Sequence, residues 1–400
     1  MTSRGVHAET LANGLLVVVG EDRRIPVVSV HLAVPAGARD DLSGRTGLAH
    51  LVEHLMFTGP ARSYAADVQG SGGRFTATTS FQRTSFGQTV PAGELGTALA
   101  REAARLTHVP SGVSAEDVVV QRSVVTNERR QRYGSRPYGT ALARLFGLAY
   151  LPGDPAGQLP LGLPDDVAGL TETDCREFLA RHYRPSGMVL VIAGDTDHET
   201  ALDVAARHFG LAPRTSAAST LPFAESDVTG ARGEWREHVP AEGLFAMVRL
   251  PPESDSRFPA ARAAVRIVEA RLPERLVTQV RFRVLRLGRG STMATFRAIA
   301  APGVRAASVE EHLRRVIEDL AAAPPSASEL ARAQAWEERD RLDRTATLAG
   351  WADEMSRVAM FHGGRAPASD PVEPEKVSAS EWLRDGMWAA TLHCLPGAAA

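Results

Sequence analysis

The sequence predicts a fold of mixed strands and helices in two or more domains, and three observations support this prediction. The chain has 400 residues, which is more than one ordinary domain contains. Its hydrophobic fraction of 44% is sufficient for sizeable cores. Predicted strands and helices follow each other in the order strand–strand–helix both near the start of the chain and in its second half. This recurrence indicates a weak internal repeat.

The chain opens with a predicted β-hairpin. An Asn-Gly turn at 13–14 separates a short strand at 9–11 from the apolar run 15–19. Asn-Gly between apolar runs is a strong hairpin signal. A further strand is predicted at 27–34, where His31 has no partner motif, and we interpret this histidine as structural.

The next segment contains the pattern His-x-x-Glu-His, formed by His50, Glu53 and His54. On an α-helix the two histidines are four residues apart, so both rings project from one face. Two neutral imidazoles at this spacing can bind one Zn²⁺. The neighbouring carboxylate can take a proton from a metal-bound water, as in the inverzincin pattern. The segment therefore predicts a zinc site.

An ordinary amphipathic helix with surface histidines is the alternative interpretation of this pattern. The flanking residues 47–49 and 55–57 are apolar, however, which predicts a largely buried helix. Histidines and a carboxylate on a buried helix need partners or a metal, so we favour the metal site. Thr46 is expected to help cap the helix, and the Gly-Pro pair at 59–60 to end it.

A zinc site needs a third protein ligand and keeps a fourth position for water. Glu128 is the best candidate for this ligand, in a charge-rich segment that we predict to be helical over 114–133. Gln121 lies seven residues earlier on roughly the same face, where it is a candidate to hydrogen-bond near the metal. Side chains on a solvated helix face are the alternative interpretation for both residues.

Four segments together resemble the M16 metallopeptidases, the family of pitrilysin and the mitochondrial processing peptidases. The first two are an opening strand at 10–15 and the helix with the His-x-x-Glu-His pattern at 46–54. The other two are a helical segment at 127–130, where the family has its third ligand, and a strand that leads to a Gly-Asp turn at 183–195. The resemblance is strong over about residues 8–210 and weak afterwards. It implies a zinc-dependent metalloendopeptidase with Glu53 as the general base and His50, His54 and Glu128 as the zinc ligands.

The resemblance also implies an α+β fold of two related domains. Each is expected to be a mainly antiparallel sheet packed with helices, the M16/LuxS-like metallohydrolase fold. We place an N-terminal catalytic domain at 1–213 and a divergent C-terminal domain at 221–400, with the boundary in the segment 211–220, which contains Pro, Ser and Thr.

A strand predicted at 74–79 is, in this family, an exposed edge beside the metal that pairs with the substrate backbone by β-augmentation. Phe75, Thr76 and Ala77 are then the substrate-binding positions. The family usually has Asn where this chain has Thr76, whose shorter hydroxyl can still hydrogen-bond. An ordinary edge strand, paired with a second strand at 84–90, is the alternative interpretation.

One feature of the family is missing from the second half. Relatives carry an Arg and a Tyr there that bind substrate carbonyls, and in them a Gly-rich turn precedes the Arg. This chain has Arg-Leu at 275–276 and Arg-Phe at 281–282, but no Gly-rich turn precedes either pair. All five tyrosines lie at or before Tyr183. We therefore expect the metal-bearing chain of an M16B-like heterodimer, in which a second M16-like chain supplies the Arg/Tyr clamp. A homodimer or monomer is the alternative assembly, and a non-catalytic scaffold subunit the alternative function.

Composition excludes several other classes. The net charge of −2 gives no basic excess, so we expect neither a nucleic acid nor an acidic membrane surface as a partner. Cys175 and Cys394 are too few for a disulfide framework, and we expect free thiols. The start lacks an apolar signal region and no run of 18 apolar residues follows, so we expect a cytoplasmic protein.

The remaining predicted elements are placed as follows. Helices are expected at 63–70, 92–107, 170–182, 198–209, 259–270, 308–322 and 327–345, and strands at 189–193, 234–238 and 244–250. The C-terminal segment 367–400 carries no motif with a chemical role. His362, His393 and Cys394 match no metal-site spacing, and we predict no second site from them.

Overall fold

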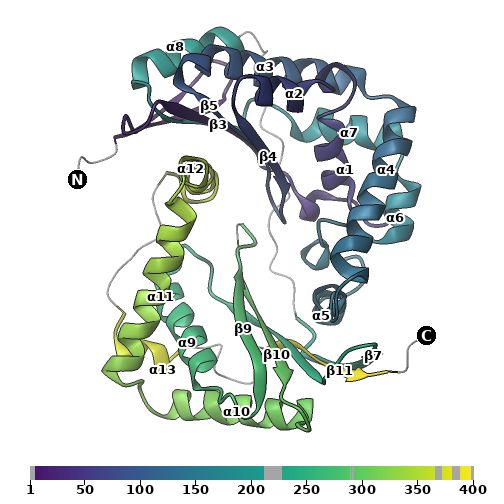
Figure 1. Cartoon of the computed structure of the whole chain (residues 1–400), viewed down its shortest axis with the longest axis vertical. Helices are drawn as coiled ribbons and strands as arrows, with labels where there is room; N and C mark the ends of the chain where they lie inside the picture. The colour runs from purple at the N-terminus through teal and green to yellow at the C-terminus, as the bar shows by residue number, and fades with distance from the viewer. Residues whose placement is uncertain are drawn as a thin grey trace. The chain divides into compact units, whose positions relative to one another are not determined.

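The computed structural model describes residues 5–210, 228–288, 290, 292–364, 372–380 and 388–397. Contacts divide the chain into two units (Figure 1). The first unit contains 1–126, 159–222 and 341–366, and the second contains 127–158, 223–340 and 367–400. The predicted domain boundary at 211–220 lies outside the described residues.

The first unit is built on a six-stranded sheet in the order β1-β2-β6-β3-β5-β4. Its strands are β1 (Val6–Thr10), β2 (Leu16–Glu21), β3 (Val27–Val34), β4 (Arg74–Thr79), β5 (Thr84–Pro91) and β6 (Val189–Gly194). β2 and β6 are parallel and the other neighbours are antiparallel. The predicted hairpin is confirmed, with Gly14 in its turn at a φ of 91°. The strand beside the metal motif, β4, lies at the edge of the sheet.

Helices cover both faces of this sheet. The first unit contains α1 (Leu48–Leu55), α2 (Tyr64–Gly70), α3 (Leu95–Gly112), α4 (Ala115–Arg129), α6 (Pro164–Gly169), α7 (Glu172–His182), α8 (His198–Phe209) and α12 (Leu348–His362). Side chains alternate between the two faces of a strand. Val17, Val19 and Leu32 accordingly pack in one core with residues of α1, α3, α7 and α8.

The opposite face of the same sheet is covered by α12, which comes from a distant part of the chain (Figure 1). Val18, Ala33 and Val191 pack there against Trp351 and Met360. The sequence analysis predicted no helix at 348–362. The first unit therefore needs residues from three separate stretches of the chain to bury both faces of its sheet.

The second unit contains a five-stranded sheet in the order β7-β11-β8-β10-β9. Its strands are β7 (Ala231–Glu237), β8 (Gly243–Leu250), β9 (Val277–Leu285), β10 (Thr292–Ala300) and β11 (Trp388–Pro396). Only the β7–β11 pair is parallel among these described strands. Its helices are α5 (Ala141–Ala149), α9 (Phe258–Arg271), α10 (Ala306–Ala322), α11 (Ala327–Thr345) and α13 (Pro374–Ser378).

Both units thus combine a mixed sheet with packed helices, and the predicted α+β class is confirmed. Cys175 and Cys394 are buried and not joined in a disulfide, as predicted. Among the described helices, none combines the length and the apolar character needed to cross a bilayer.

Candidate metal centre

The helix α1 is fixed at its start by an aspartate from the preceding loop. Asp41 accepts hydrogen bonds from the backbone N–H of Gly47, at 2.7 Å, and of Ala49, at 2.8 Å. These are donors that a helix start leaves without partners inside the helix. The predicted capping by Thr46 is wrong, because Gly47 is the N-cap, with a φ of 88°, and the Thr46 hydroxyl instead donates to Asp166 at 2.7 Å.

The structure brings the three predicted zinc ligands together. One potential ligand atom from each of His50, His54 and Glu128 lies within 4.8 Å of the other two. The histidine rings of α1 meet edge to face, with centroids 4.8 Å apart. His50 is buried while His54 and Glu128 are half-buried, so the cluster is accessible from one side.

Glu128 is positioned by α4, a continuous helix whose first twelve residues belong to the first unit. The division between the units runs through the last turn of this helix, after Thr126. Arg132, one turn further on, forms an ion pair with Glu128 at 2.7 Å. Glu128 is thus placed by the last turn of α4, and its carboxylate is paired with a residue just beyond that helix.

Gln121, predicted to lie near the metal, is in contact with the ring of His54. Its Oε1 is 3.3 Å from Nδ1 of His54. An amide oxygen only accepts hydrogen bonds, so this contact requires the proton of His54 on Nδ1. The lone pair is then on Nε2, which is the form of the ring that a metal binds.

The carboxylate of Glu53 is buried and is held by a residue that the sequence analysis missed. Thr79, the last residue of β4, donates a hydrogen bond from Oγ1 to Oε2 of Glu53 at 2.6 Å. Thr79 Oγ1 lies 3.3 Å from Oγ1 of Thr84, which donates to the backbone oxygen of Ala36 at 2.9 Å. The signal in the sequence was parity, since Thr79 lies two residues after Ala77 and therefore faces the same side of the strand as the inward-facing Phe75 and Ala77.

Tyr183 is also buried in this region. Burial raises the pKa of its phenol, and the negative charge of Glu53 raises it further. The tyrosine is therefore neutral at physiological pH, so it adds no second negative charge next to the carboxylate.

β4 has the features of an edge strand open to a further strand. In the part of the chain that the structure describes, it pairs with β5 alone. Phe75 packs against Phe57 and Tyr64, with ring centroids 5.6 and 5.5 Å apart, and Ala77 packs against the same core. Thr76 is exposed. Phe75 and Ala77 thus use their side chains for packing, and the backbone of the strand is what remains for another chain to bind.

Behind β4 and β5 lies a buried ion pair that supports this wall of the site. Glu102 accepts hydrogen bonds from Tyr64, from Arg105 and, at 2.9 Å, from Nε2 of Gln88. Both charged side chains are buried, and the guanidinium of Arg105 lies 4.1 Å from the ring centroid of Phe86. Tyr64 and Gln88 come from α2 and β5, which both contact β4, and Arg105 comes from α3, which contacts β5.

The other histidine and cysteine predictions concern residues away from this cluster. His31 lies 3.1 Å from a carboxylate oxygen of Asp353, in agreement with a structural role. His393 lies 2.7 Å from Glu310. Neither His362 nor Cys394 belongs to a metal-type cluster among the described residues.

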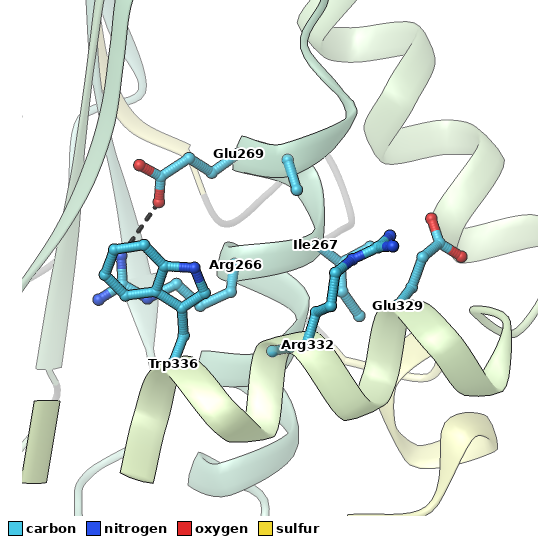
Figure 2. A pocket seen from close by; sticks show the side chains of 8 residues that line it. Arg266, Ile267, Glu269, Glu329, Arg332 and Trp336 are labelled. Carbon is cyan, nitrogen blue, oxygen red and sulfur yellow. Dashed lines mark hydrogen bonds and ion pairs between the residues drawn. The ribbon is translucent and has the colours of Figure 1, made fainter. Parts of the chain in front are cut away.

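A separate pocket of about 250 Å³ lies in the second unit between α9 and α11. Figure 2 shows its lining, in which the indole of Trp336 lies beside Arg266, which pairs with Glu269 at 3.0 Å. None of its lining residues belongs to the metal cluster. The pocket is therefore separate from the candidate metal cluster.

Comparison with known families matches two successive parts of the chain. Residues 16–135 match the family model described as insulinase (peptidase family M16), and residues 169–335 match the model described as the peptidase M16 inactive domain. His50, Glu53, His54 and Glu128 all lie in the first matched range. The description "inactive" therefore applies to a segment that contains none of the four.

Curated relatives match about half of the chain. The chain is 29% identical over 205 residues to the zinc protease PqqE of Helicobacter pylori, covering 50% of this chain and 46% of that one. It is 32% identical over 213 residues to an uncharacterised zinc protease of Mycobacterium leprae, covering 52% and 47%. The chain thus matches about half the length of these relatives.

Solved structures match over nearly the whole chain. A protease from Helicobacter pylori superposes with a TM-score of 0.87 at 21% identity, covering 98% of this chain and 100% of that one. An M16 inactive-domain protein from Pseudomonas fluorescens gives 0.82 at 16% identity, covering 99% and 98%. At these identities the structures establish the shared fold.

Proposed function

Because this chain belongs to peptidase family M16, we propose that it is a zinc-dependent metalloendopeptidase that cleaves peptides or unfolded segments. The observation that carries the proposal is the convergence of His50, His54 and Glu128 beside the buried carboxylate of Glu53. Two relatives that are named zinc proteases support the same reaction class.

The residues present fit a zinc ion. Two imidazoles and one carboxylate are a ligand set of catalytic zinc sites, which keep a further position for water. The contact of Gln121 with Nδ1 of His54 leaves the other ring nitrogen for the metal. When bound, Zn²⁺ polarises a water and the substrate carbonyl as a Lewis acid.

The chain's own residues supply the remaining functions. The Glu53 carboxylate accepts a proton from the attacking water and passes it to the leaving nitrogen. Thr79 keeps that carboxylate in one orientation through its hydrogen bond to Oε2. The backbone of β4 binds an extended substrate as an added strand, at Phe75, Thr76 and Ala77, which favours peptides and unfolded segments over folded proteins.

We further propose that this chain works with a second M16-like chain. The support is in the sequence, where no tyrosine follows Tyr183, so the Arg/Tyr pair that binds substrate carbonyls in relatives is missing as a pair. The partner would supply that pair and this chain the metal. A non-catalytic scaffold is the competing function, and the intact His-x-x-Glu-His pattern argues against it.

Zinc analysis and peptide cleavage of the purified chain test the proposal. The wild type should hold zinc at the cluster and cleave a library of quenched fluorescent peptides, alone or with a second M16-like chain from the same genome. Glu53→Gln should keep its zinc and lose about 10²–10⁴-fold in rate, because only proton transfer is removed. Equal rates for the wild type and Glu53→Gln would show that the base is misassigned, and a wild type without zinc or cleavage would favour the scaffold.

A further inference from the structure

A second cluster of metal-ligand side chains lies in the first unit, and it shares no residue with the proposed catalytic site. One potential ligand atom from each of His7, Glu21 and His198 lies within 4.8 Å of the other two. We propose that these residues form a second site for a divalent cation of the zinc class. The proposal does not depend on the peptidase assignment.

The topology of the first unit brings the three residues together. His7 in β1 pairs directly with Val19 in β2, and Glu21 lies two residues further along the same strand. Residues two apart on a strand face the same side of a sheet, so His7 and Glu21 share a face. Val19 packs with residues of α8, which lies against this face, and His198 is the first residue of α8.

The contacts within the cluster show a partly preformed site. The imidazoles of His7 and His198 are stacked, with centroids 4.3 Å apart and an angle of 15° between planes. Oε1 of Glu21 accepts a hydrogen bond from the backbone N–H of His198 at 3.0 Å and lies 3.3 Å from its Nδ1. The carboxylate is thus held next to both rings, and two imidazoles with one carboxylate are a donor set that zinc prefers.

Binding requires only small side-chain movements. Ligand atoms around a tetrahedral zinc are about 3.3 Å apart, so the separations here must shorten by about 1.5 Å or less. His7 is exposed, and Glu21 and His198 are half-buried, so rotation about their side-chain bonds can supply this change. Asp197, the residue before His198, adds negative charge close by, and hydrogen bonds from Thr200 lower the pKa of its carboxyl.

A bound ion would connect the first strand to the helix that packs on its neighbour. All five residues of β1 are exposed, and β2 is its only strand partner among the described residues. An ion bound by one ligand from β1, one from β2 and one from α8 would therefore link these three elements at this edge of the sheet. Protection of the β1 amides by zinc is the structural consequence that can be measured.

Zinc titration of metal-free protein tests the site, with calorimetry as the readout. In the His50→Ala/His54→Ala background, which removes the proposed catalytic site, about one equivalent of Zn²⁺ should still bind. Adding His7→Ala and His198→Ala should abolish this binding or weaken it at least about tenfold. Glu21→Gln, which keeps the shape of the side chain, should weaken it in the same direction. His208→Ala, in the same helix but outside the cluster, is the matched control and should leave it unchanged.

Hydrogen exchange of the same background protein gives a second readout. Zn²⁺ should slow exchange of the amides at 6–10 and should not do so in the His7→Ala/His198→Ala variant. Equal zinc affinity with and without the two substitutions, or β1 exchange that zinc does not change, would overturn the proposal. A different result is expected if zinc does not bind at the proposed catalytic site. Zinc binding by the wild type would then be lost when His7 and His198 are replaced, and His50→Ala would not affect it.

Discussion

Thr79 Oγ1 and Glu53 Oε2 are 2.6 Å apart, and this buried hydrogen bond links the end of the edge strand β4 to the metal-motif helix α1. The strand that we propose to bind the substrate therefore ends on the side chain that we propose to move the proton. Hydrogen bonds to charged groups contribute about 1.5–3 kcal/mol, so the link is strong enough to set the orientation of the carboxylate.

Thr79→Val should lower kcat by about 10- to 100-fold, because it removes the hydroxyl while keeping the volume of the side chain. KM and zinc content should change little, since neither the metal ligands nor the backbone of β4 is altered. Thr79→Ser restores the hydroxyl and should recover most of the rate. A Thr79→Val enzyme with wild-type kcat, or a Thr79→Ser enzyme as slow as Thr79→Val, would show that the bond does not position the base.

Glu128→Ala should weaken zinc binding at the proposed catalytic site by at least about tenfold, because it removes one of three protein ligands. The measurement is zinc affinity in a background with His7 and His198 replaced by Ala, so that only one candidate site remains. Glu116→Ala is the matched control, because it removes an exposed carboxylate from the first turn of the same helix, outside the cluster. Zinc affinity that is the same in the Glu128→Ala and control proteins would exclude Glu128 from the ligand set.

Arg105→Met should destabilise the first unit by about 3–5 kcal/mol, because it leaves the buried carboxylate of Glu102 without its cation. Urea unfolding measures the loss. The double variant Arg105→Met/Glu102→Gln removes the uncompensated charge and should regain a large part of it. If the single variant is as stable as the wild type, the buried pair does not support the wall of the site behind β4 and β5.

Glu310 predicts a specific pH dependence of stability in the second unit. Burial raises the pKa of its carboxyl, but hydrogen bonds from His393 and Arg314 and the charge of Arg232 outweigh burial and lower it to about 2 from a usual value of 4.5. A carboxyl with a lowered folded-state pKa stabilises the fold above its unfolded pKa, and this contribution is lost as pH falls towards the folded value.

The comparison of wild type with Glu310→Gln measures this contribution. At pH 7 the wild type should be more stable by about 1–2 kcal/mol, a value reduced by partial solvent screening. The difference should shrink as the pH is lowered from about 4.5 towards 2. A difference that stays constant over this range would mean that the ionised form of Glu310 is not what stabilises the fold.

The local elements of the first half could be predicted from the sequence because their signals are local. The strand at 27–34 and the helix at 198–209 have the bounds that were predicted. The spacing of His50 and His54 also fixes their common helix face without knowledge of the rest of the chain. The approach of Glu128 was predicted from the family resemblance and is present in the structure.

Features that depend on distant contacts were not predicted. Thr46 is adjacent to the true N-cap, but the group that binds the helix start comes from Asp41, in a loop whose path the sequence does not reveal. Thr79 reaches Glu53 only because β4 lies beside α1. The strand β11, between β7 and β8, comes from the last residues of the chain, where nothing local marks a central strand.

The packing of α12 on the sheet has a consequence for folding of this protein during its synthesis on the ribosome. Gly20 fits beneath the indole of Trp351 so closely that an added Cβ would lie 2.7 Å from Cη2, so this face is shaped for that helix. A nascent chain that ends before residue 348 already carries every residue of the candidate metal cluster, yet one side of its sheet is still uncovered and apolar. Until residue 362 has emerged, that side is open to chaperones and to aggregation.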